Sequence, residues 1–88
     1  MNVAFRRSFV RDLKKIKDRQ ILDRVDDVIQ QVEAADSRQN ITALKKLSGK
    51  DNYYRIRIGD YRIGLVWKKG LVEFIRCLSR RDIYREFP

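Results

Sequence analysis

Histidine is absent from this chain of 88 residues, and cysteine occurs once, at Cys77. Without histidine, zinc hydrolases and histidine-activated nucleophiles are excluded. One cysteine allows neither an internal disulfide nor a cysteine-based zinc site. The apolar stretch Ile63–Trp67 is far shorter than the ~20 residues of a membrane span. Because the first residues also lack the apolar core of a signal peptide, we expect a cytoplasmic protein without a membrane partner.

Positive charge is abundant, with 21 Lys and Arg against 12 Asp and Glu and a net charge of +9. Residues 21–43 carry two bases and five acids, so the excess lies in the parts of the chain before and after them. The hydrophobic content of 43% is typical of globular proteins. The length and composition therefore predict one folded domain over residues 1–88, with an anionic partner.

The first half of the chain reads as helical. Val3 and Phe5 are expected to form a short opening strand. The spacing of Phe9, Leu13 and Ile16 predicts a helix of about three turns. A second helix, with Asp18 as its N-cap, has an apolar stripe made of Leu22, Val25, Ile29 and Val32. We expect the two helices to form a hairpin, since neither can bury its stripe alone.

The second half reads as strands. Residues 53–58 and 61–67 alternate in polarity around Gly59-Asp60, which predicts a two-residue type II′ hairpin turn. A second turn at Lys69-Gly70 precedes a third strand over residues 71–78. The C-terminal tail is expected to form one helical turn or to lie extended. The predicted fold is α+β, an N-terminal helical hairpin packed on a twisted antiparallel sheet of about four strands.

The predicted turn sets the register of the hairpin, and with it the two faces of the sheet. Arg57 should face Arg62, and Arg55 should face Gly64. The apolar face, which should receive the helices, consists of Tyr54, Ile56, Ile58, Tyr61, Ile63, Leu65 and Trp67. The other face carries Tyr53, Arg55, Arg57, Arg62 and Lys68, with Gly64 as a bare position.

This second face indicates a binding site for a polyanion. Like charges directly opposite on adjacent strands are destabilising, so the pair Arg57 and Arg62 is a poor choice for stability alone. A glycine inside a strand often marks a close approach to the backbone, here at Gly64. Arginine grips phosphate with two donors, and Tyr53 offers a stacking surface for a base. Lys68 and the lysines of the first helix fit ordinary solvated positions, which would still attract phosphate in general.

The strings FRRSFVRDLKKI, KKLSGKDNYYRIRIGDYRIGLVW and SRRDIYREFP resemble the RelE/ParE superfamily of bacterial type II toxin–antitoxin toxins. The resemblance spans essentially the whole chain and is closer to the RelE branch. It implies a ribosome-dependent endoribonuclease that cuts mRNA in the decoding site and needs neither a metal nor another cofactor. It also implies partners: the ribosome, mRNA and a RelB-like antitoxin, in a toxin–antitoxin complex that is an oligomer.

The resemblance implies the catalytic residues, and the charged sheet face and the tail supply the expected binding residues. Those expected to take part in catalysis are Arg55, Arg57, Arg62, Arg80, Arg81 and Tyr84. Those expected to bind RNA are Tyr53, Arg55, Arg57, Arg62, Lys45, Lys46, Lys50 and Lys68. The antitoxin is expected to contact Ile83, Tyr84 and Phe87, where a partner segment would displace the tail.

Acid–base chemistry is the open point of this interpretation. Many relatives carry a histidine at the position of Ser79, and histidine titrates near neutral pH. Arg55 and Arg57 cannot act as bases, because a guanidinium is not deprotonated in proteins. Proton transfer is therefore left to Tyr84, to a lysine or to the ribosome. Two alternatives stay open: a ParE-like inhibitor of DNA gyrase, and a domain that binds RNA or the ribosome with weak or lost cleavage.

Overall fold

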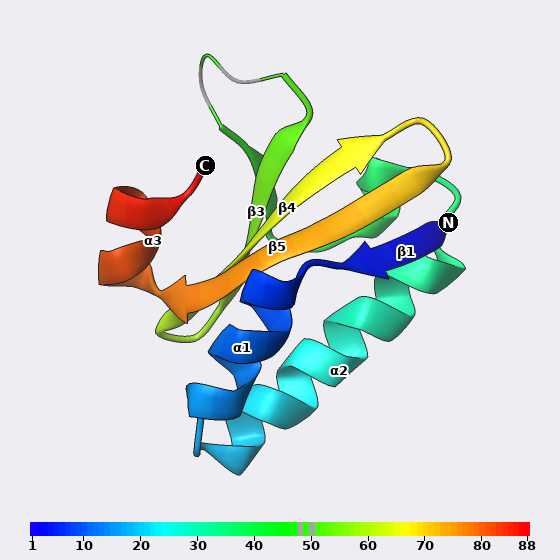
Figure 1. Cartoon of the computed structure of the whole chain (residues 1–88). Coiled ribbons are helices and arrows are strands. Elements are labelled where there is room, and N and C mark those ends of the chain that lie inside the picture. Colours follow the sequence, from blue (N-terminus) through cyan, green and yellow to red (C-terminus); the bar gives the residue numbers. More distant parts are fainter. Residues whose placement is uncertain (48, 50) are drawn as a thin grey trace.

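The structure, a computed structural model, describes residues 1–47, 49 and 51–88. Its elements, in chain order, are β1 (Asn2–Phe5), α1 (Arg7–Lys15), α2 (Arg19–Ala34), the 3-10 helix η1 (Arg38–Asn40), β2 (Leu44–Lys46), β3 (Tyr53–Ile58), β4 (Tyr61–Lys68), β5 (Leu71–Ser79) and α3 (Arg80–Glu86). The strands form one sheet in the order β1-β5-β4-β3-β2 (Figure 1).

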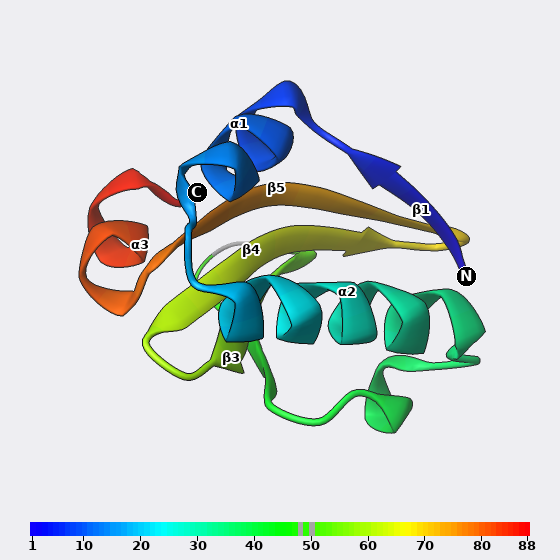
Figure 2. The same cartoon turned by 90° about the horizontal axis from the view of Figure 1, so that it is seen from below.

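The two N-terminal helices form as their sequence patterns predict. The Asp18 carboxylate caps α2 by accepting hydrogen bonds from the N–H groups of Gln20 at 2.9 Å and Ile21 at 3.4 Å. A side-chain cap of this kind satisfies N–H groups that have no partner within the helix. α1 packs on β5, whereas α2 contacts β1 and β3 and lies in front of the sheet in Figure 2.

The core lies between these helices and the predicted apolar face of the sheet. Ile56, Ile58, Ile63 and Leu65 are at most 1% exposed, and the helices add to this cluster Phe9, Val25 and Val32. Burying each such side chain contributes about 1.5–3 kcal/mol. The apolar alternation of the strands therefore selects which face of the sheet the helices cover.

The register of the β3–β4 hairpin is the one that the turn predicts. Ile58 pairs with Tyr61, Arg57 with Arg62, and Arg55 with Gly64. Gly59 has a φ of +54°, which glycine adopts without the steric penalty that other residues face. The arginines of the two strands consequently share the face opposite the core.

The antiparallel sheet of about four strands, with a helical hairpin on it, is a wrong prediction in part. The sheet has five strands and is mixed, because β1 runs parallel to β5 with Val3 opposite Val72. β2 was not predicted at all. It is three residues long and pairs antiparallel with β3, placing Lys45 opposite Arg55. No local turn in the sequence predicts either pairing. β1 and β5 are far apart in the chain, and β2 is too short to show an alternating pattern.

The C-terminal tail folds back as α3 and packs on β5 and β4. It forms two turns of helix rather than the single turn or extended segment expected. The Ser79 hydroxyl caps it by accepting a hydrogen bond from the Asp82 N–H at 3.2 Å. No helix in the described part of the chain is long and apolar enough to cross a membrane.

Candidate nucleic-acid interface

Three arginines form the floor of a cleft on the open face of the sheet. Arg55 and Arg57 come from β3, and Arg62 comes from the facing position of β4. The Arg62 guanidinium donates hydrogen bonds from Nη1 to the carbonyl oxygens of Gly59 at 2.8 Å and Tyr61 at 2.9 Å. The turn that sets the register therefore also holds this side chain in place.

The charges of this floor repel one another. Burial and the positive charges of Arg57, Arg55 and Arg80 lower the pKa of Arg62. Arg62 is therefore held among other cations while its guanidinium is hydrogen-bonded to backbone oxygens. A phosphate placed over the floor would relieve this repulsion and accept bidentate hydrogen bonds.

The two walls of the cleft come from elements that flank the hairpin. On one side, α3 supplies Tyr84, whose ring centroid lies 4.9 Å from the guanidinium carbon of Arg55. On the other side, β2 supplies Lys45, which pairs in register with Arg55. The cleft has a volume of about 480 Å³ and is lined by Ala43, Leu44, Lys45, Arg55, Arg57, Arg62 and Tyr84.

The group that closely approaches Gly64 is not the ligand that was predicted. A Cβ atom on Gly64 would lie 2.7 Å from the ring of Phe87, so the close approach comes from the chain's own tail. Phe87 is buried, and its ring centroid lies 5.7 Å from that of Tyr53. The Phe87 ring fills the space over Gly64, and neither Gly64 nor Tyr53 lines the cleft.

Other predicted residues do not line the cleft. Arg80 and Arg81 are both exposed and lie outside its lining, although the charge of Arg80 acts on Arg62. Lys46 pairs with Tyr54 and so belongs to the opposite face. Lys68 lies at the other end of β4, where it forms an ion pair with Glu73 at 3.8 Å.

The other predicted residues are Ile83, Tyr84, Phe87 and Lys50. Ile83 is the buried residue of α3, whereas Tyr84 on the same helix is 67% exposed. Phe87 closes the tail over Gly64. The prediction for Lys50 lies outside the described residues.

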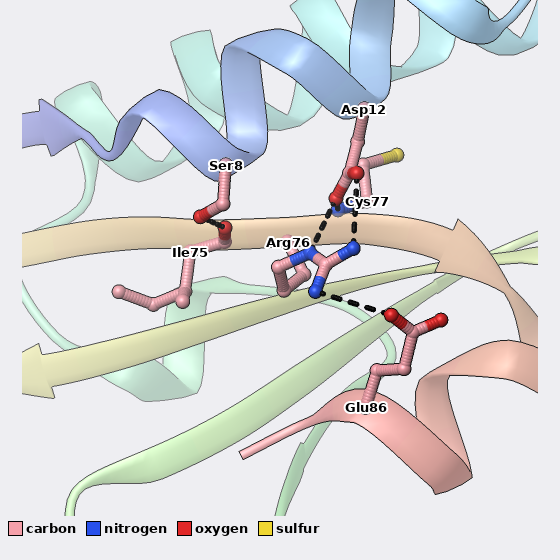
Figure 3. A network of polar contacts seen from close by, with 6 residues as sticks. All are labelled: Ser8, Asp12, Ile75, Arg76, Cys77 and Glu86. Atoms are coloured by element: carbon pink, nitrogen blue, oxygen red, sulfur yellow. Dashed lines mark hydrogen bonds and ion pairs between the residues drawn. The ribbon is translucent and has the colours of Figure 1, made fainter.

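A network between α1, β5 and α3 was missed by sequence reasoning. Asp12 on α1, only 5% exposed, accepts hydrogen bonds from Arg76 at 2.7 and 3.1 Å and from the Cys77 N–H at 2.9 Å (Figure 3). Arg76 also lies 3.6 Å from Glu86 on α3. The hydrogen bond to Asp12 raises the pKa of Arg76. The network links α1, β5 and α3, the helix that carries Tyr84.

The signal for this network was present in the sequence. Asp12 follows Phe9 by three residues and precedes Ile16 by four, so it lies within the apolar stripe of the first helix. A carboxylate in such a stripe needs a partner, because burying an unpaired charge is costly. Its partner, Arg76, is 64 positions away in the chain, and nothing in the local pattern identifies it.

Fold and cleft together define a small α+β protein with a cationic surface suited to a phosphate-bearing ligand. Residues 3–84 match the family model for the ParE toxin of the type II toxin–antitoxin system parDE. The chain belongs to this family, within the RelE/ParE superfamily of toxins, as the sequence motifs predicted.

Individual relatives agree with this membership. The chain is 38% identical over 89 residues to Toxin RelE3 of Methanocaldococcus jannaschii, with both sequences covered in full. It is also similar to a chain of the RelB–RelE antitoxin–toxin complex from Methanococcus jannaschii, with 37% identity, a TM-score of 0.82, and 97% and 99% of the two chains covered. The YoeB dimer from Staphylococcus aureus shares the fold at 17% identity, with a TM-score of 0.74 over 91% and 97% of the chains.

Proposed function

We propose that this toxin is a ribosome-dependent endoribonuclease that cuts mRNA in the decoding site, in the cytoplasm, and thereby inhibits translation. The observation that carries the proposal is the cleft in which Arg55, Arg57 and Arg62 form a cationic floor beside an exposed tyrosine. Such a floor matches the phosphate of a single strand, and Tyr84 matches an unstacked base. The full-length similarity to Toxin RelE3 supports the same class of activity.

The reaction that this cleft suits is attack of a ribose 2′-hydroxyl on the adjacent phosphate. The phosphorus then gains an oxygen ligand, and its oxygens carry more negative charge than in the substrate. Arginines fixed in advance stabilise that charge without reorganising during the step, and this is often the largest catalytic contribution. Arg62 is the best placed of the three, because backbone oxygens hold its guanidinium.

The test is a comparison of variants at equal expression. Arg62→Ala removes a floor cation, and Tyr84→Phe keeps the ring but removes the hydroxyl. We expect Arg62→Ala to slow mRNA cleavage about 10²–10³-fold, the usual effect of removing one fixed electrostatic contact. Both variants should relieve growth arrest, while Lys69→Ala, in the exposed β4–β5 turn, should stay toxic. Full toxicity of both site variants would refute the assignment of this site.

A ParE-like inhibitor of DNA gyrase is the second candidate, because the matching family model describes a ParE toxin. The two candidates differ in what induction does to the cell. New mRNA ends within codons, with rapid loss of translation, would support the endoribonuclease. Intact mRNA with induction of the DNA-damage response would support the gyrase inhibitor. Ribosome binding without new RNA ends would support an RNA-binding domain that has lost cleavage.

A RelB-like antitoxin is the proposed partner, in an oligomeric toxin–antitoxin complex. The solved relative at 37% identity is a RelB–RelE complex. We propose that the antitoxin contacts the tail at Ile83, Tyr84 and Phe87, where α3 borders the cleft. Hydrogen exchange tests this proposal: residues 80–88 should gain or lose protection when the antitoxin binds. Unchanged exchange there would place the contact elsewhere.

A further inference from the structure

The cleft contains few groups that can transfer a proton. Its lining residues include three arginines, whose guanidinium groups do not lose a proton in proteins. It includes no carboxylate, and the chain contains no histidine. Among the lining residues this leaves the ammonium of Lys45 and the phenol of Tyr84. Cleavage at an RNA phosphate needs an acid for the departing 5′-oxygen, which is otherwise a poor leaving group.

These two groups lie on opposite sides of the floor. The sheet order places β3 between β4 and β2, so Lys45 on β2 stands on the far side of Arg55 from Arg62. Tyr84 reaches Arg55 from α3, which packs on β4 and β5. In a displacement at phosphorus, the attacking and leaving oxygens are roughly in line on opposite sides of the phosphorus atom. A phosphate on the floor therefore presents one of these oxygens to each wall.

The backbone just before Lys45, in the β2 wall of the cleft, has an unusual conformation. Ala43, which lines the cleft with Lys45, has a φ of +64°. An alanine in this left-handed region costs about 1–3 kcal/mol, and such residues cluster at functional sites. β2 is only three residues long, and its pairing with β3 directs Lys45 and Arg55 to the same face.

We infer that Lys45 is the proton donor to the leaving 5′-oxygen, an inference that rests on the proposed function. The bond from the 2′-oxygen to phosphorus forms, and the bond from phosphorus to the 5′-oxygen breaks. The Lys45 ammonium gives one proton to that oxygen, and water takes the proton of the 2′-hydroxyl. The products are a 2′,3′-cyclic phosphate and a 5′-hydroxyl, and Lys45 then regains a proton from water. Tyr84, on the other wall, positions the attacking ribose.

A lysine suits this place better than another arginine would. The ammonium is a compact charge that can both attract the negative leaving oxygen and release a proton. The neighbouring guanidinium groups of Arg55, Arg57 and Arg62 attract the phosphate but keep their protons. Lys45→Arg therefore retains the positive charge of the wall and removes only the ability to give up a proton.

The test is cleavage by the full-length toxin on ribosomes that hold a defined mRNA in the decoding site. Lys45→Arg should lose about 10²–10⁴ in single-turnover rate, the usual contribution of a general acid. Its affinity for the ribosome should stay within about twofold of that of the parent protein, because the charge is retained. Lys69→Arg is the matched control, since Lys69 lies in the exposed β4–β5 turn, outside the cleft.

A sulfur substrate separates proton donation from mere positioning. Replacing the bridging 5′-oxygen of the scissile phosphate by sulfur gives a thiolate leaving group, which needs no proton because thiols have a pKa of about 8.5. We expect Lys45→Arg to cleave this substrate at nearly the parent rate. Lys45→Arg cleaving the oxygen substrate within threefold of the parent rate would overturn the inference, as would sulfur rescue of Tyr84→Phe alone.

Failure of the inference is distinguishable from failure of the proposed function. If the parent protein cuts the mRNA and Lys45→Arg cuts it equally well, the endoribonuclease function stands and only the proton donor is wrong. If the parent protein cuts neither substrate, both the endoribonuclease function and the role of Lys45 are refuted. Circular dichroism of each variant confirms that a lost rate does not reflect unfolding.

Discussion

Gly64 illustrates how one residue can be predicted to matter for a reason that the structure changes. As expected of a glycine inside a strand, something approaches its backbone closely. The approaching group is the ring of Phe87, at 2.7 Å from where a Cβ atom would lie, and not a ligand. The absent side chain thus makes room for the tail, which in turn keeps α3 and its tyrosine beside the arginine floor.

Gly64→Ala should therefore destabilise the protein by about 1–3 kcal/mol, the usual cost of inserting a methyl group into a packed site. Urea denaturation measures this change. In a Phe87→Ala background the same substitution should be neutral or slightly stabilising, because alanine is favoured over glycine by about 0.5–1 kcal/mol in a strand. Equal costs in the two backgrounds would show that Phe87 does not contact Gly64 in solution.

At the scale of elements, α1 takes over the edge of β5 where β1 ends. β1 pairs with β5 only as far as Phe74, and the Arg6 N–H then bonds to the Phe74 carbonyl. Two residues later the Ser8 hydroxyl donates to the Ile75 carbonyl, and one turn of helix beyond it Asp12 accepts from the Cys77 N–H. Side chains of a helix thus satisfy backbone groups that a neighbouring strand would otherwise satisfy, and they close this part of the edge.

Asp12→Asn tests how much this contact contributes to the free energy of unfolding. The substitution keeps the shape of the side chain but removes the charge that pairs with Arg76, so we expect a loss of about 3 kcal/mol in the free energy of unfolding. Asp23→Asn is the matched control. Its ion pair with Arg19, at 3.8 Å, is exposed at both ends, so the cost should stay below about 0.5 kcal/mol. A similar cost for both substitutions would contradict the network.

The reactivity of the Cys77 thiol is a second measure of how tightly α1 packs on β5. Burial, and secondarily the charge of Asp12, raise the pKa of its thiol to about 12. Because the thiolate is the reactive form, alkylation of the folded protein at pH 8 should be slow and should require opening of the structure. Asp12→Asn should speed this alkylation by loosening α1, whereas Asp23→Asn should leave the rate unchanged. Fast alkylation of the unsubstituted protein would refute the burial of Cys77.

At the scale of the whole molecule, the net charge of +9 is unevenly placed. The acidic residues of α2 are exposed on the helical side of the sheet, whereas the arginine floor occupies the other side. Such a molecule orients in the field of a polyanion and presents its cleft first. Binding to RNA should weaken steeply as salt is added, because each neutralised phosphate releases counterions.

This salt dependence can be assigned to residues. Arg57→Gln should reduce the slope of log K against log salt by about 0.7, the value for one phosphate contact on a single strand. Lys69→Gln is the matched control, because Lys69 lies in the exposed β4–β5 turn, outside the cleft. Fluorescence anisotropy with a short single-stranded RNA at several salt concentrations measures both slopes. Equal changes for the two variants would contradict binding in the cleft.

Local patterns were enough to predict much of this protein. The hydrophobic periods indicated two helices and three long strands, and Asp18 was predicted to cap the second helix. The Gly59-Asp60 turn set the register that aligns Arg57 with Arg62. These features depend on residues close in the chain, where propensity, turn geometry and alternation act directly. The motifs of residues 5–16, 45–67 and 79–88 together also identified the superfamily.

Tertiary structure alone decided the features that join distant segments. The parallel pairing of β1 with β5, the addition of β2, the contact of Phe87 with Gly64 and the link from Asp12 to Arg76 each connect residues without a local signal. Each contact forms because the rest of the fold leaves a group without a partner. These groups are the free edge of a strand, the uncovered backbone of Gly64 and the buried charge of Asp12. The sequence by itself determined that arginines would share one face of a hairpin. Only the assembled sheet decided that Lys45 and Tyr84 would border them, because side chains from distant elements meet only when the whole core has packed.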